Sequence, residues 1–308
     1  MSQLLVIFGA TGQQGGSVAN IVAASPELSK RFRVRGVTRD PSKPAADMLR
    51  IKGIEVVQAD LDDEQSIRTA VEGAHTVFGM TRTIYDEEAK EREVRQGRAL
   101  ADAAVAAGAQ HFIWSTQCHA ETVSGGQYPV GSYDSKAEVE QYIRSLPIKS
   151  SFFAAATFMQ NLSGMMTPRP VGDGTYAIAN IVSGAAKFPW IDVVEDSGKF
   201  VGAILATPEK YYGKVLYAAS CIHSLDEVAA MIGKSTGKTV NYTVMPEEKY
   251  RGFLPPVAAD TIVNMFLYIQ DFGYYGAETE ERVKWSGEQA LGDLTSMEEF
   301  VSRAIKLE

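Results

Sequence analysis

The chain has 308 residues, of which 45% are hydrophobic and 22% are charged, as in an ordinary globular protein. Its 30 basic and 38 acidic residues give a formal net charge of −8, which argues against direct binding to nucleic acid, because such binding needs clustered Lys and Arg. Two cysteines and four scattered histidines show no metal-ligand spacing, and no long apolar run or signal peptide predicts contact with a membrane. The expected location is cytoplasmic, with the nucleus as a further compartment.

The N-terminus carries the most informative pattern. Residues 4–8 form the apolar run LLVIF, and Gly9, Gly12 and Gly15 follow before a helix-compatible segment. Glycine permits a tight turn with positive φ and lets an anion approach the main chain, while the N-terminus of a helix attracts negative charge. A strand, a glycine turn and a helix in this order predict a pyrophosphate-binding loop, with an ordinary glycine turn as the alternative.

Strand-like and helix-like segments alternate through the first half of the chain. Strands are expected at residues 4–8, 33–39, 54–59, 75–80, 111–116 and 151–156, and helices at 45–52, from Asp62, at 86–107 and at 134–144. Parallel strands need crossover connections, which helices at this spacing supply. The pattern therefore predicts an α/β fold, a Rossmann-type doubly wound parallel sheet with its ligand crevice at the carboxyl ends of the strands.

The second half is less regular and predicts a smaller C-terminal α/β lobe. We expect a nucleotide-binding domain over residues 1–157 and the smaller lobe over residues 158–308, with strands near 190–220 returning to the main sheet. Aromatic residues of this lobe are expected in its core, or alternatively around a pocket. The lobe's strands are expected at 213–218 and 240–244, and its helices at 225–232 and 297–305.

The second and third strands end in residues that suit the adenosine half of a dinucleotide. Arg39 stands where NAD-binding proteins place an acidic residue for the ribose, and Lys43 follows in the next turn. A guanidinium matches phosphate oxygens, so this pair favours NADP(H) over NAD(H), with a solvated surface arginine as the alternative. Asp60 and Leu61 end the third strand, where they would contact adenine or, with Asp62, cap the next helix.

Several segments resemble the NmrA-like proteins, an atypical group of short-chain dehydrogenases/reductases. The resemblance covers most of the chain and rests on GATGQQGG (9–16), VTRDPSK (37–43), QADLDD (58–63), SYDSKAEVEQYIR (132–144), FMQNL (158–162) and WIDVVEDSGKFVGAIL (190–205). It implies a Rossmann domain, a small C-terminal lobe and NADP(H) in the cleft between them. The cofactor-binding positions that it implies are Gly9, Thr11, Gly12, Gln13, Gln14, Gly15, Arg39, Lys43, Asp60, Leu61, Thr81, Arg95, Lys136, Phe158 and Asn161.

The segment around Lys136 decides whether an enzyme is expected. Reductases of the short-chain superfamily use a YxxxK pair, whose tyrosine is the acid/base. Here the residue four positions before Lys136 is Ser132, and Tyr133 is one position out of register. This departure favours an NADP(H)-binding redox sensor or regulator that acts through a protein partner, such as a transcription regulator.

The alternative is an NADPH-dependent reductase of a small carbonyl, enone or imine metabolite, with Lys136 as its catalytic proton donor. In that case Ser115, Thr116 and Tyr133 would orient the substrate. Two other roles are open to Lys136, namely binding of the nicotinamide ribose and an ion pair with Glu140 at i+4 on the helix.

Overall fold

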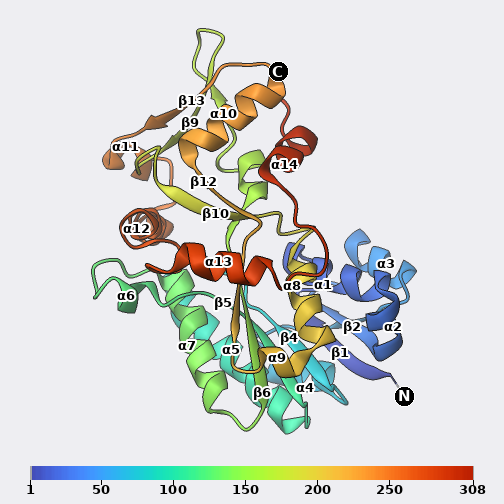
Figure 1. The fold of residues 1–308 in the computed structure, drawn as a ribbon. Coiled ribbons are helices and arrows are strands. Elements are labelled where there is room, and N and C mark those ends of the chain that lie inside the picture. The colour runs from blue at the N-terminus through green and yellow to red at the C-terminus, as the bar shows by residue number, and fades with distance from the viewer. Residues whose placement is uncertain (1, 308) are drawn as a thin grey trace.

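The alternating pattern of the first half folds into a parallel sheet with helices on both faces, in a computed structural model that describes residues 2–307 (Figure 1). All seven strands pair in parallel, in the order β11-β6-β5-β4-β1-β2-β3. The order reverses between β1 and β4, so the carboxyl ends of these two strands are where a ligand crevice is expected. The strands are β1 (Gln3–Phe8), β2 (Phe32–Thr38), β3 (Glu55–Gln58), β4 (Thr76–Gly79), β5 (His111–Thr116), β6 (Lys149–Ala155) and β11 (Val215–Ala218).

Two apolar layers attach the helices to the sheet. Successive side chains of a strand point to opposite faces, so Leu5 and Ile7 of β1 enter one core while Val6 and Phe8 enter the other. This is why β1 reads as a continuous apolar run. One face carries α1 (Gln13–Ala24), α2 (Pro26–Arg31), α3 (Pro44–Ile51), α8 (Ser197–Ala206), α9 (Pro208–Tyr211) and α13 (Thr279–Gly287), and the other carries α4 (Glu64–Val71), α5 (Ala89–Ala106) and α7 (Gly131–Ser145).

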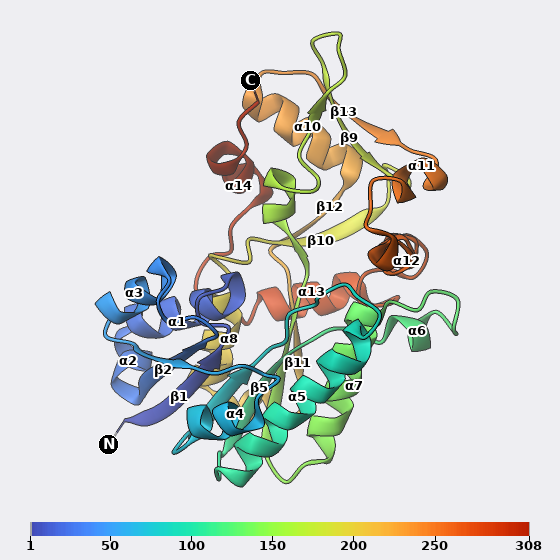
Figure 2. The same ribbon diagram turned by 180° about the vertical axis from the view of Figure 1, so that it is seen from behind.

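The second lobe lies beyond the carboxyl ends of the central strands (Figures 1 and 2). It holds two small sheets, β12-β10-β7 and β13-β9-β8, whose strands come from distant parts of the chain. The strands are β7 (Thr157–Phe158), β8 (Arg169–Pro170), β9 (Tyr176–Asn180), β10 (Lys187–Ile191), β12 (Cys221–Ser224) and β13 (Val240–Val244), and the remaining helical segments are α6 (Ala120–Val123), η1 (Met159–Ser163), α10 (Leu225–Thr236), α11 (Glu247–Arg251), α12 (Pro256–Phe272) and α14 (Met297–Ala304).

The returning segment divides between the two lobes. β11 extends the central sheet beside β6, and α8 packs against α1. β10, by contrast, pairs with β7 and β12 in the second lobe. The long helix α12 was not expected, although its buried Ile262, Phe266 and Ile269 follow helical spacing.

Two helix starts differ from the sequence-based expectation. The N-cap of α4 is Asp63 and not Asp62, because Asp63 Oδ1 accepts from the backbone N–H groups of Gln65 (3.0 Å) and Ser66 (3.3 Å). The helix expected from residue 134 begins at Gly131. Lys136 consequently lies in the second turn of α7 and not at its start.

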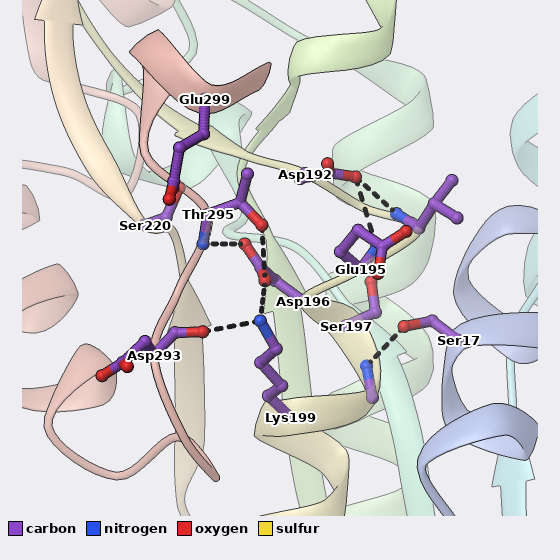
Figure 3. Close-up of polar contacts among 12 residues, drawn as sticks. Ser17, Asp192, Glu195, Asp196, Ser197, Lys199, Ser220, Asp293, Thr295 and Glu299 are labelled. Atoms are coloured by element: carbon purple, nitrogen blue, oxygen red, sulfur yellow. Dashed lines mark hydrogen bonds and ion pairs between the residues drawn. The ribbon is translucent and has the colours of Figure 1, made fainter. Parts of the chain in front are cut away.

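Buried carboxylates fix the second lobe to the Rossmann-type domain (Figure 3). Asp196, at the start of α8, accepts hydrogen bonds from Thr295 N (3.0 Å), Thr295 Oγ1 (3.1 Å) and Lys199 Nζ (2.7 Å). Ser17 Oγ on α1 accepts from Gly198 N at 2.8 Å, which joins α1 to α8. Asp192 accepts from Gln160 Nε2 at 2.6 Å, so the segment that follows β7 is held by the same junction. These contacts join α8 to α1 and to the segment that precedes α14.

Candidate functional site

The glycine loop forms the tight turn that the sequence predicts. Gly9 has φ +68°, and Gly12 N donates to Gly9 O at 2.8 Å. A Cβ on Gly15 would lie only 2.4 Å from Gly9 O, so this glycine lets α1 begin directly against the end of β1. The N-cap Gly12 has no side chain, and Gln13 and Gln14 at the start of α1 line the groove described next.

A groove of about 510 Å³ runs along the carboxyl ends of β1, β2, β3 and β4. It brings together most of the expected cofactor positions from five separate segments of the chain. Those that line it are Gly9, Thr11, Gly12, Gln13, Gln14, Arg39, Lys43, Asp60, Leu61, Thr81 and Phe158.

The part of the groove beside β2 carries two basic side chains, Arg39 and Lys43. Arg39 is exposed, and no carboxylate within residues 2–307 pairs with its guanidinium. Lys43 Nζ lies 4.0 Å from the Asp40 carboxylate. Hydrogen bonds from the Ser42 hydroxyl and amide lower the pKa of Asp40 and keep this carboxylate turned toward its own loop. Arg39 is therefore free to meet an anion.

Thr81 supplies an unpartnered hydroxyl at the middle of the groove. It follows β4 at the point where the strand order reverses, and its side chain is buried. Among the residues that the structure describes, Thr81 Oγ1 has no hydrogen-bond partner. A buried hydroxyl without a partner is costly, so this atom fits a groove that holds a polar ligand.

Four expected positions lie outside the groove. Gly15 acts behind it, through the packing of α1, and Lys136 and Asn161 line the adjoining cavity. Arg95 is not brought into either space. Its side chain is 61% exposed on α5 and its Nη2 lies 3.8 Å from Asp62 Oδ1, at the outer rim.

The adjoining cavity has a volume of about 320 Å³ and shares Gln14 and Phe158 with the groove. Its wall in the second lobe is apolar and comes from the segment after η1, from β10 and from α12. Its wall in the Rossmann-type domain is polar and comes from β5, α7 and the loop after β4. The apolar wall contains Met165, Met166, Phe188, Ile262, Met265, Phe266 and Ile269, and the polar wall contains Thr83, Ser115, Thr116, Gln117, Ser132 and Lys136.

Lys136 is held by an acidic residue that sequence reasoning missed. Its Nζ donates to Glu93 Oε2 on α5 at 2.7 Å, to Ser132 O at 3.1 Å and to Thr83 Oγ1 at 3.2 Å. The alternative ion pair with Glu140 is not formed, because Lys136 pairs with Glu93 while Glu140 pairs with Arg144 at 2.7 Å. Glu93 stands 43 positions before Lys136, so no local spacing could have indicated the pair.

The remaining polar residues of this wall also have partners. Ser115 Oγ donates to Gln14 Oε1 at 2.8 Å, which ties the glycine loop to the end of β5. Thr116 Oγ1 donates to Glu140 Oε2 at 2.7 Å. Tyr133 lines the cavity and packs on Tyr274 with ring centroids 5.7 Å apart, and burial raises the pKa of Tyr133 well above its ordinary value. Its phenol therefore stays protonated near neutral pH.

Within residues 2–307, no helix is both long and apolar enough to span a bilayer. Over the same residues, no three His, Cys, Asp or Glu side chains gather where they would hold a metal ion.

Comparison with known sequences gives whole-chain matches. Residues 1–301 match the sequence model of the NmrA-like family. The NmrA-like family domain-containing oxidoreductase FrzB of a Cladobotryum species is 27% identical over 301 residues, which cover 91% of this chain and 88% of FrzB. An NmrA-like family domain-containing protein of Dictyostelium discoideum is 26% identical over 313 residues, which cover 98% of each chain.

Solved structures share the fold over the whole chain. NmrA, described as a negative transcriptional regulator and solved with NADP, matches with a TM-score of 0.82 and 22% identity, over 98% of this chain and 95% of its own. The same regulator has been solved with NAD. The triphenylmethane reductase of Citrobacter sp., solved with NADP(H), matches with a TM-score of 0.77 and 20% identity, over 98% of this chain and 100% of its own. A regulator and a reductase thus share this architecture.

Proposed function

This chain belongs to the NmrA-like family, and from that premise we propose that it binds NADP(H) and reduces a small, apolar carbonyl, enone or imine compound. The groove along β1 to β4 supports the cofactor. Its glycine turn and the N-terminus of α1 suit a pyrophosphate, and Thr81 Oγ1 needs a polar partner. The unpaired Arg39 beside Lys43 suits a 2′-phosphate and so favours NADP(H) over NAD(H).

The cavity next to the groove is the observation that carries the reductase. A sensor needs room for the dinucleotide alone, whereas this chain also has about 320 Å³ of space between its lobes. The space meets the groove at Gln14 and Phe158, and its far wall is built of methionine, phenylalanine and isoleucine side chains. An apolar pocket with a few convergent polar groups is the usual form of a small-molecule site.

Two residues of the polar wall, Lys136 and Ser115, would take part in such a reaction. Reduced nicotinamide supplies a hydride when it is bound. Negative charge then develops on the substrate oxygen or nitrogen, and the Lys136 ammonium is the hydrogen-bond donor that would stabilise it. Ser115, bonded to Gln14, would hold the glycine loop beside the reacting end of the cavity. Glu93 Oε2 holds Lys136 Nζ in place at 2.7 Å, and a proton from solvent water completes the product.

A cavity-filling variant tests this function. Met265→Trp on α12 adds volume inside the cavity, and Val257→Trp places the same side chain on the exposed side of that helix. With NADPH and a panel of aromatic ketones, enones and imines, the wild type should oxidise the cofactor in a substrate-dependent manner. Met265→Trp should lose about tenfold or more in kcat/KM while its NADP+ affinity is unchanged, and Val257→Trp should match the wild type. Absence of any substrate-dependent oxidation would overturn the proposal.

A redox sensor or regulator is the second candidate. Ser132 stands where the superfamily's tyrosine would be, and all three N–H groups of Lys136 already have acceptors. Both features suit a chain that holds the dinucleotide without turning it over. In this function the lobes would present a different surface to a protein partner, such as a transcription regulator, with NADP+ and with NADPH. Partner capture that is identical with the two cofactors would exclude it.

A further inference from the structure

The ion pair between Glu93 on α5 and Lys136 on α7 includes a residue, Glu93, that lines neither the groove nor the cavity. We infer that Glu93 is a positioning residue, which holds the Lys136 ammonium in place at the wall of the cavity, toward the nicotinamide half of the cofactor. This inference rests on the proposed binding of NADP(H), although its test does not depend on turnover.

The Lys136 ammonium has a complete set of acceptors. Its three N–H groups meet Glu93 Oε2 at 2.7 Å, Ser132 O at 3.1 Å and Thr83 Oγ1 at 3.2 Å. Only one of these acceptors is charged. A ligand oxygen can therefore take the place of the neutral Thr83 hydroxyl, which lines the cavity, while the contact with Glu93 persists.

Glu93 depends on Lys136 for its charge balance. The Glu93 side chain is 2% exposed and that of Lys136 is 14% exposed. Glu93 Oε2 accepts one further hydrogen bond, from Ser135 Oγ at 2.6 Å, and Glu93 Oε1 has no partner among the described residues. A buried carboxylate is costly unless it is paired and hydrogen-bonded, so Glu93 keeps its contact with the Lys136 ammonium. This contact holds the ammonium in one place.

Close helix packing brings the pair together. Gly97 lies one turn after Glu93 on α5, and a Cβ there would be 2.6 Å from Val139 Cγ2 on α7. Glycine thus allows the two helices to approach, and Figure 2 shows them side by side. A second ion pair, Lys90 Nζ to Glu138 Oε1 at 2.8 Å, joins the same two helices outside the groove and the cavity, with the cation on the other helix.

That second pair provides a matched control. Glu93→Gln and Glu138→Gln each remove one carboxylate charge from the contact between α5 and α7 with little change of shape. Titration calorimetry with NADP+ needs no substrate. It measures the affinity for the cofactor, which should decrease when Lys136 is no longer held in place. We expect Glu93→Gln to weaken NADP+ binding by about tenfold or more, and Glu138→Gln to leave it within about twofold, while thermal melting confirms that both variants are folded. Equal affinities of the two variants would overturn the inference.

A charge exchange separates positioning from simple attachment of the helices. The double variant Glu93→Lys with Lys136→Glu keeps an ion pair between α5 and α7 but moves the cation away from the cavity. Its melting temperature should return toward the wild-type value, whereas NADP+ affinity should stay low. Recovery of affinity in the double variant would show that Glu93 only joins the helices. If no substrate is found, the reductase proposal fails while these affinities still decide the role of Glu93.

Discussion

Replacing Arg39 with alanine tests the cofactor assignment most directly. The Arg39 guanidinium lies exposed at the end of β2, and no carboxylate of residues 2–307 pairs with it. Its removal therefore breaks no ion pair of the protein itself. Lys43 cannot replace it fully, because Lys43 Nζ already lies 4.0 Å from the Asp40 carboxylate. Any loss of affinity should come from the 2′-phosphate of the ligand.

The expected magnitude follows from the exposure of the site. A hydrogen bond to a charged group contributes about 1.5–3 kcal/mol. Solvent screening at an exposed arginine reduces this to about 1–2 kcal/mol. The Kd for NADP+ should then rise about 5–30-fold, and the Kd for NAD+, which has no 2′-phosphate, should not change. Higher ionic strength should narrow the preference of the wild type for NADP+.

Titration calorimetry with both dinucleotides measures the effect. Arg33→Ala is the matched control, because Arg33 is exposed on the same strand but does not line the groove. It should leave both affinities unchanged. Equal losses of NADP+ and NAD+ binding in Arg39→Ala would refute the assignment of the 2′-phosphate to this residue.

The remaining predictions concern buried groups. Gly15→Ala places a Cβ 2.4 Å from Gly9 O and should lower NADP+ affinity by about a hundredfold in the same assay, whereas Gly16→Ala, with its closest contact at 3.3 Å, should be tolerated. Burial lowers the pKa of His111 to about 4 from 6.5, so the unfolded chain takes up a proton first as the pH falls. Stability should then decrease by about 3 kcal/mol between about pH 6.5 and pH 4, and His111→Gln should flatten this part of the melting profile. Burial raises the pKa of Cys118 to about 12, so iodoacetamide should modify it at about pH 8 far more slowly in the folded protein than in urea; equal rates would contradict the burial.

Local patterns predicted the Rossmann-type sheet and most of the groove. The glycine loop, Arg39 and Asp60 each stand at the end of a strand, and parallel strands bring their carboxyl ends to one edge. Strand and helix bounds were predicted within a few residues where alternation was regular. The helix α12 was not predicted, because its apolar spacing lies in an irregular stretch that gave no strand-helix alternation to anchor it.

The amino-acid sequence by itself determined the glycine turn, the parallel strands and the basic residues that follow the second strand, because each depends on backbone geometry over a few residues. Only the tertiary structure decided the surroundings of Lys136. Its partner Glu93 comes from a different helix, and the apolar wall opposite comes from the segment after η1, from β10 and from α12 of the second lobe. Contacts between segments so far apart depend on how helices and lobes pack, and side-chain spacing along the chain does not encode that packing.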